Sequence, residues 1–282
     1  MASQTSDKRN NDTRLAVSGD MFDRLLGVDD KRHGKCEKHG DFIEVHCSGK
    51  GKSSEGWKGC PECQQEQRDA EVKAQAVREQ QEREQRRLER MLTGSGVPPR
   101  FRDKTFENFK AADGKQASNL RKIREYADAV CSDGHGGRSL VMMGKVGTGK
   151  THLGCALLQY AIRATQQACH YWTFAELVRA VKGSFAKGSD YSEQDIYSDF
   201  AAPRLVVLDE VGIQNFTDFE QAVAYEAINH RYLAEKPTVL ITNLQAADLP
   251  MCVGERVVDR LREGGGRALD FDWKSYRSGG AV

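Results

Sequence analysis

Short apolar runs alternate with amphipathic segments from about residue 101 onward. Runs at residues 139–143, 169–172, 205–208 and 239–242 predict strands, and a weaker fifth follows at residues 268–271. Helical spacing of apolar positions marks residues 151–163, 174–181 and 219–233, and a capping box from Thr217 to Glu220 begins the last of these. Strands that alternate with helices predict an α/β fold, with a parallel sheet flanked by helices on both faces.

The region before this has a different pattern. Residues 64–90 are rich in Gln, Glu and Arg, contain no Gly or Pro, and carry few large apolar side chains. Glu79 and Arg83 lie at i,i+4 with the acid first, which is the favourable order on a helix. We therefore expect a solvated helix that bridges two modules and ends at residues 93–96.

The N-terminal segment is polar. Residues 1–20 are rich in Ser, Asn and Asp and predict disorder, whereas Met21, Phe22, Leu25 and Leu26 fall on one face of a two-turn helix. That helix either packs on its own domain or docks on a partner protein. The whole pattern divides the chain into a tail at 1–31, a small module at 32–66, a charged helical linker at 67–96 and the α/β domain at 97–282.

Charge and cysteine content narrow the chemistry. The formal net charge is only +1, so any basic surface must be local. No apolar stretch is long enough to span a bilayer, and residues 1–30 lack a signal-peptide pattern, so we expect a cytoplasmic protein with no membrane partner. Thiols stay reduced in that compartment, and the eight cysteines therefore favour metal binding over disulfides.

A glycine-rich loop follows the first strand of the α/β region. The motif G-x-x-x-x-G-K-[ST] is formed by Gly144, Lys145, Val146, Gly147, Thr148, Gly149, Lys150 and Thr151. A strand before it and a helix after it give the context in which this motif binds nucleotide phosphates. Its backbone N–H groups suit the phosphates of ATP, Lys150 would reach the β- and γ-phosphates, and Thr151 would bind Mg²⁺.

Polar residues end two of the other predicted strands. Asp209 and Glu210 follow the buried run at 205–208, at the sheet edge where ligands bind in open α/β sheets. Asp209 can hold Mg²⁺ and Glu210 can activate the attacking water, so the pair predicts an ATPase. Asn243 follows the run at 239–242 and can reach the γ-phosphate or its water.

Cysteine and histidine cluster before the linker. Cys36 and His39 form one pair with a two-residue gap, Cys60 and Cys63 form another, and twenty residues separate the pairs. One such Cys₃His set can close a tetrahedral Zn²⁺ site, and a module this short would need the metal to fold. His46 and Cys47 are rivals for one ligand position, although neither belongs to a pair with this spacing.

Further motifs lie at residues 209–214, 240–243, 254–262 and 271–277, and two more lie at residues 97–101 and 105–109. The first four resemble the DnaC family of bacterial helicase loaders, which belongs to the wider DnaC, DnaI and IstB-like group, and the last two are similar to the start of that family's ATPase domain. The resemblance spans roughly residues 97–277. It implies an AAA+ ATPase without a C-terminal lid domain, which loads a DnaB-like replicative helicase onto single-stranded DNA in an ATP-controlled cycle.

The resemblance also implies roles for particular residues. It makes Asn243 a sensor, and it makes Arg256 and Arg260 the candidates for phosphate sensing and for an intersubunit finger in a self-associated form, without assigning the two roles. DNA binding in the family falls between the second and third strands, which here includes Lys182 and Phe185. The alternative for that stretch is a solvated amphipathic helix with Phe185 in the core.

The cysteine module departs from the DnaC pattern. Related loaders of the DnaI type carry a zinc-binding helicase-docking domain, which implies docking here, and direct nucleic-acid binding is the alternative. Two further functions are open for the whole chain, an IstB-like transposition helper ATPase and an ATP-switched adaptor protein. The zinc module and the motif at residues 271–277 disfavour the transposition helper.

Overall fold

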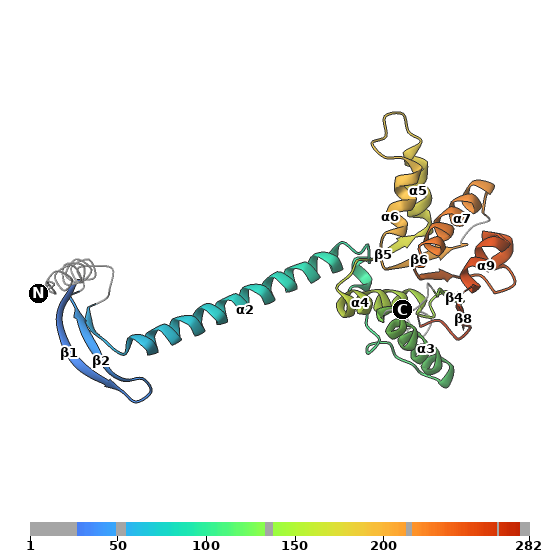
Figure 1. Ribbon diagram of the computed structural model, residues 1–282. Helices are drawn as coiled ribbons and strands as arrows, with labels where there is room; N and C mark the ends of the chain where they lie inside the picture. Colours follow the sequence, from blue (N-terminus) through green and yellow to red (C-terminus); the bar gives the residue numbers. More distant parts are fainter. Residues whose placement is uncertain (1–26, 49–54, 133–137, 213–215, 264, 277–282) are drawn as a thin grey trace, which may run out of the picture. The chain divides into compact units, whose positions relative to one another are not determined.

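Figure 1 shows the computed structural model, which describes residues 27–48, 55–132, 138–212, 216–263 and 265–276. The chain divides into two units, Met1–Arg83 and Glu84–Val282. The predicted two-turn helix with Met21, Phe22, Leu25 and Leu26 lies outside the described residues. No described helix is long and apolar enough to cross a membrane.

The first unit contains a three-stranded antiparallel sheet. Its strands are β1 (Val28–Cys36), β2 (Gly40–Cys47) and β3 (Gly56–Lys58), in that spatial order. The Arg32 guanidinium lies 4.0 Å from the ring centroid of Trp57, and the centroid of the His46 ring lies 5.3 Å from it. The buried apolar residues among those described in this unit are only Cys47 and Cys60. So little buried apolar surface does not stabilise a sheet by itself.

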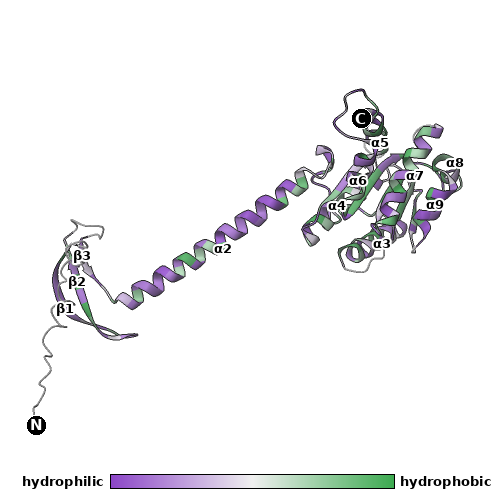
Figure 2. Cartoon of the chain, turned by 45° about the horizontal axis from the view of Figure 1, so that its top comes forward, coloured by the Kyte–Doolittle hydropathy of each residue, from purple (hydrophilic) through white to green (hydrophobic). Residues whose placement is uncertain are grey.

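The helix that follows is long and solvated. Helix α2 (Pro61–Thr93) buries none of its residues fully, and Figure 2 shows it hydrophilic along most of its length. The predicted helix at 64–90 is therefore present and is longer at both ends. We expected a solvated helix along its whole length, but its last turns are partly buried. Leu88, Met91 and Leu92 pack against the core of the second unit. A division at residue 97 would cut through this packing.

The second unit is built on a parallel sheet with the strand order β5-β6-β7-β4-β8. Parallel strands need crossover connections, and helices supply them. The strands are β4 (Leu140–Gly144), β5 (Cys169–Thr173), β6 (Leu205–Val211), β7 (Thr238–Thr242) and β8 (Arg267–Phe271). The helical elements are η1 (Pro99–Phe101), α3 (Gly114–Cys131), α4 (Lys150–Thr165), α5 (Phe174–Ser184), α6 (Glu193–Ala201), α7 (Asp218–Leu233), α8 (Leu249–Val253) and α9 (Glu255–Arg262).

Alternate residues of the strands face two separate cores. On one face, Leu140 and Met142 of β4 pack with α3 and α4. On the other face, Val141 and Met143 pack with α5, α6, α7, α8 and α9. The sheet is therefore covered on both faces, which explains why its strands are continuous apolar runs.

The α/β prediction and the parallel sheet flanked by helices are confirmed. The five predicted strands and the three predicted helices are present, and the capping box between Thr217 and Glu220 is formed. The sequence pattern did not reveal the antiparallel sheet of the first unit. β1 is mostly charged and exposed, so it lacks the apolar alternation that marks a strand lying on a core.

Candidate nucleotide site and metal centre

The loop between β4 and α4 needs glycine at two positions. Gly144 has φ +124°, and a Cβ atom there would lie 2.4 Å from the carbonyl oxygen of Phe271. Gly149 has φ +92°, and a Cβ atom there would lie 2.6 Å from the ring of Phe109. Both positions combine a left-handed backbone with close neighbours, so only glycine fits. The loop ends at the N-terminus of α4, where free backbone N–H groups suit an anion.

Lys150 and Thr151 begin α4 and point toward different partners. The Nζ atom of Lys150 donates hydrogen bonds to the carbonyl oxygens of Gly144 at 2.6 Å and Lys145 at 2.7 Å. Burial lowers the pKa of Lys150 to about 8, although Asp209 opposes that shift. The Thr151 hydroxyl donates to Oδ2 of Asp209 at 2.7 Å. This contact joins the glycine-rich loop to the end of β6.

Asp209 and Glu210 occupy an irregular end of β6. The pairing of β6 with β7 shifts register between Leu208 and Val211, and Glu210 has φ +61°. A bulge with a left-handed residue re-aims the side chain, and Glu210 lines the cleft while Asp209 stays buried. Burial raises the pKa of Asp209, against the hydrogen bonds from Thr151 and from the Glu210 backbone N–H.

These residues surround one cleft of about 510 Å³. Of the residues predicted for ATP, it brings together Val146, Gly147, Thr148, Gly149, Lys150, Thr151, Asp209, Glu210 and Asn243. Arg100, Lys104 and Lys110 also line it and add positive charge. None of these three cations was predicted to line the cleft. Lys104 and Lys110 carry no motif, and the motif that contains Arg100 indicated only a family resemblance.

Residues that follow β8 donate hydrogen bonds to the glycine-rich loop. The indole Nε1 of Trp273 donates to the carbonyl oxygen of Thr148 at 3.1 Å. The backbone N–H of Tyr276 donates to the carbonyl oxygen of Gly147 at 2.9 Å, and its hydroxyl donates to that of Lys110 at 2.8 Å. The motif at residues 271–277 contained the signal for this contact, but only as a resemblance without a stated role.

The two candidate arginines lie on α9, and neither is among the residues that line the cleft of their own chain. Arg256 is exposed. Arg260 stacks over the ring of Tyr232 at 4.2 Å from the centroid and lies 3.5 Å from a carboxylate oxygen of Glu263. Neither of these contacts of Arg260 involves the glycine-rich loop, Asp209 or Glu210.

Lys182 and Phe185 lie at the end of α5 and share an aromatic neighbour on α7. Phe185 is 60% exposed, so the alternative that places it in the core is wrong. Its ring lies 6.2 Å from that of Phe219, and the Nζ atom of Lys182 lies 5.5 Å from the same ring. Phe219 is partly buried, so the exposed ring of Phe185 beside the Lys182 cation is the part of this surface on which an unpaired base could stack.

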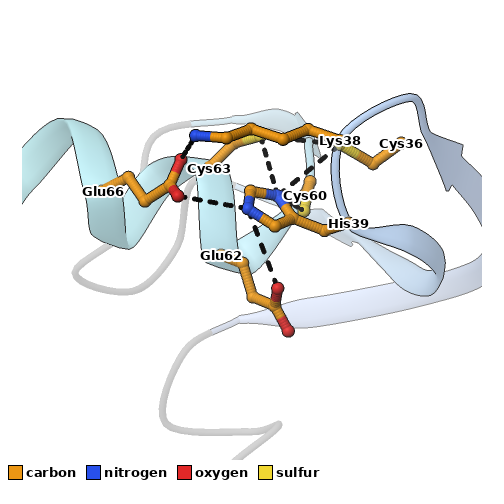
Figure 3. A network of polar contacts seen from close by, with 7 residues as sticks. All are labelled: Cys36, Lys38, His39, Cys60, Glu62, Cys63 and Glu66. Carbon is orange, nitrogen blue, oxygen red and sulfur yellow. Dashed lines mark hydrogen bonds and ion pairs between the residues drawn. The ribbon is translucent and has the colours of Figure 1, made fainter.

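The four predicted metal ligands of the first unit converge (Figure 3). Cys36 and His39 flank the β1–β2 turn, and Cys60 and Cys63 lie at the start of α2. Nδ1 of His39 is 3.7, 3.5 and 3.3 Å from the sulfurs of Cys36, Cys60 and Cys63, respectively. Tetrahedral zinc, with bonds of about 2.3 Å to sulfur and about 2.0 Å to nitrogen, separates its donor atoms by roughly 3.5–3.8 Å. The distances from His39 are therefore close to those of a Zn²⁺ site, and all four donor atoms lie within 4.8 Å of one another.

Three thiols and one imidazole are ligands that zinc binds in proteins. Backbone N–H groups of His39 and Lys38 lower the pKa of Cys36 to about 6, which favours the thiolate. The sulfur of Cys36 lies 3.5 Å from that of Cys63 and raises the pKa of Cys63 to about 11. His46 lies outside the cluster because its Nδ1 contacts Asp29 at 2.6 Å. Cys47 is not one of the four converging residues either.

The chain is similar to several known proteins. A family model described as IstB-like ATP binding protein matches residues 67–260. Replicative helicase loader DnaC of Escherichia coli strain K12 is 32% identical over 199 residues, which cover 70% of this chain and 79% of that protein. The uncharacterized protein YdaV of the same strain is 30% identical over 224 residues, covering 79% of this chain and 82% of that one.

Solved structures share the fold of the second unit. The crystal structure of the DnaC helicase loader covers 61% of this chain and 99% of its own, with a TM-score of 0.55 at 24% identity. The crystal structure of DnaI covers 66% and 98%, with a TM-score of 0.52 at 16% identity.

Proposed function

This chain belongs to the IstB-like ATP-binding protein family and is an AAA+ protein of the DnaC type, and on this premise we propose that it is an ATP-dependent loader of a replicative DNA helicase. The match to a replicative helicase loader along most of that protein's length carries the proposal. The cleft supports it, since a switch driven by ATP needs both a phosphate-binding loop and a hydrolytic carboxylate.

We assign the steps of ATP turnover to four residues of the cleft. Lys150 binds the β- and γ-phosphates once these displace its contacts with the loop carbonyls. Thr151 and Asp209 would hold Mg²⁺, which would neutralise charge on the phosphates. Glu210 takes the proton from the attacking water, and its exposed position in the cleft gives water access to it.

We propose that Arg256 or Arg260 completes the site of a neighbouring subunit. Arg256→Ala or Arg260→Ala should then leave ATP binding intact but lower its hydrolysis. Mixing either variant with Lys150→Ala protein should partly restore turnover, because the intact arginine of one chain serves the intact loop of the other. A mixture no more active than its separate components would exclude action across a subunit boundary.

The surface of Lys182 and Phe185 is proposed to bind single-stranded DNA. Phe185→Ala should weaken binding of a fluorescent oligonucleotide by roughly 1–3 kcal/mol, the usual range for one base stacked on an aromatic ring. Leu233→Ala serves as the control, since Leu233 is 70% exposed on α7 and has no assigned role. Equal loss in both variants, or none in Phe185→Ala, would remove this surface from DNA binding.

For the first unit we propose a zinc-stabilised module that docks on the helicase, with α2 as the connection to the ATPase domain. Direct nucleic-acid binding by this module is the alternative. Immobilised replicative helicase should retain the full chain whether or not ATP is present, and Cys60→Ser should lose retention. If the wild-type chain ignores the helicase and its Cys60→Ser variant loses affinity for DNA, the alternative is correct.

The transposition helper is the second candidate function, because the matching family model is described as IstB-like. A helper would act on a transposase and duplex DNA. ATP turnover stimulated by duplex DNA, together with failure to bind any replicative helicase, would support it over the loader.

A further inference from the structure

The two ring nitrogens of His39 face different groups (Figure 3). Nδ1 points at the three sulfurs, whereas Nε2 lies 3.2 Å from Oε1 of Glu66. An imidazole that binds a metal does so through the nitrogen without a proton, and the other nitrogen carries the proton and donates it. In this arrangement Nδ1 is the donor to the metal, and Nε2–H donates to the Glu66 carboxylate.

Glu66 is itself held in place. Its second oxygen, Oε2, forms an ion pair with the Nζ atom of Lys38, which precedes His39 in the β1–β2 turn. Glu66 also follows Cys63 by three residues on α2, so the two side chains lie on one face of the helix. Glu66 therefore connects the two parts of the module that supply the ligands. Its carboxylate contacts Lys38 and His39 of the β1–β2 turn, and its backbone belongs to α2.

A second acidic residue nearby has weaker geometry. Oε2 of Glu62 lies 3.9 Å from Nε2 of His39, beyond a hydrogen bond, and the Glu62 side chain is 72% exposed. Glu62 thus has the same charge on the same helix without the hydrogen bond, which makes it a matched control.

We propose that Glu66 is a positioning residue of the metal centre, which fixes His39 with Nδ1 toward the metal and ties the second turn of α2 to the β1–β2 turn. This inference rests on the proposed zinc site. Groups that hydrogen-bond to a metal-binding histidine typically change metal affinity by roughly 10–100-fold when they are removed. Loss of Glu66 would also remove the contacts of its carboxylate with Lys38 and His39, so α2 would be joined less firmly to the β1–β2 turn.

Zinc affinity of the full chain, measured by competition with a chromophoric chelator, tests the inference. Glu66→Ala should bind zinc roughly 10–100-fold more weakly than wild type. Glu66→Gln keeps an oxygen that accepts the hydrogen bond but lacks the charge, so its affinity should lie between the two. Glu62→Gln should stay within about twofold of wild type if only the hydrogen-bonded carboxylate matters.

Nitrogen NMR of the zinc-loaded, ¹⁵N-labelled chain supplies a readout that a general loss of stability would not move. The His39 ring should show a proton on Nε2 and metal-bound Nδ1. Metal on Nε2, an unchanged affinity in Glu66→Ala, or an equal loss in Glu62→Gln would each overturn the role of Glu66. Wild-type protein that holds no zinc would instead refute the metal centre itself, and these outcomes are distinct.

Discussion

The phenol of Tyr171 donates a 2.9 Å hydrogen bond to Oδ2 of Asp209. Tyr171 lies on β5 and Asp209 lies on β6, and these two strands are adjacent in the sheet. The same oxygen accepts the hydrogen bond from Thr151, so both donors favour the ionised carboxylate. On its other side, the backbone N–H of Tyr171 donates to the carbonyl oxygen of Ser95 at 2.7 Å. Tyr171 thus links the segment that follows α2 to the acid proposed to hold Mg²⁺.

Tyr171→Phe should therefore impair Mg²⁺ use. Burial already raises the pKa of Asp209, and loss of the phenol hydrogen bond raises it further. Since the carboxylate form binds Mg²⁺, the acid limb of the ATPase pH profile should move to higher pH, and half-maximal activity should need roughly tenfold more Mg²⁺ at neutral pH. Unchanged Mg²⁺ and pH dependence would exclude this role.

Lys150 and Glu210 should separate binding from hydrolysis. Lys150→Ala should abolish binding of a fluorescent ATP analogue, because the phosphates lose their cation. Glu210→Gln should retain the analogue but release phosphate roughly a hundredfold more slowly or worse, because only the group that accepts the proton is lost. Equal phosphate release by wild type and Glu210→Gln would remove Glu210 from that step.

Substitution of Arg231, which is not among the residues that line the cleft, should lower the stability of the second unit. Its side chain is fully buried and donates to backbone carbonyls within residues 200–204 and to Pro237 at 2.6 Å. Arg231→Met should destabilise the second unit by roughly 3–5 kcal/mol, since those carbonyls would be left without a donor. Urea unfolding followed by tryptophan fluorescence measures this, with the exposed Arg163→Met as control. Equal midpoints would contradict it.

Metal removal should affect one unit. Elemental analysis of protein purified without chelator should find one zinc per chain, and Cys60→Ser should lose it. Limited proteolysis should then cut within residues 32–66, while nucleotide binding stays within about twofold of wild type. Cys131→Ser in the second unit is the control. A chain without bound metal, or an uncut Cys60→Ser variant, would contradict the account.

The sequence predicted the elements whose place in the fold is visible in their own local pattern of residues. The strands around Leu140 and Val207 are buried on both faces, so their apolar runs were visible, and the loop from Gly144 to Thr151 has a fixed spacing. Tyr171, Trp273 and the cations of the cleft were not predicted. Tyr171, Lys104 and Lys110 reach the site through tertiary packing from positions that carry no motif, so only the fold brings them there. Trp273 and Arg100 lie in motifs that indicated a family resemblance but no contact with the site.

In the metal module, the site was predicted from the sequence but the fold around it was not. Its four ligands were predicted from spacing and do converge, although its sheet was missed because charged strands such as β1 carry no apolar signal. Glu66 was not identified either. A glutamate in a run of Gln, Glu and Arg looks like any other solvated helix residue until the β1–β2 turn is placed beside it.

The most direct test of the loader proposal is transfer of a replicative helicase to a single-stranded DNA circle that is coated with single-strand-binding protein. Release of an annealed labelled strand reports successful loading. With ATP, the wild-type chain should allow unwinding at helicase concentrations that are inactive alone, and the Lys150→Ala chain should not. Equal unwinding with wild type, with Lys150→Ala and with no added chain would contradict the proposal.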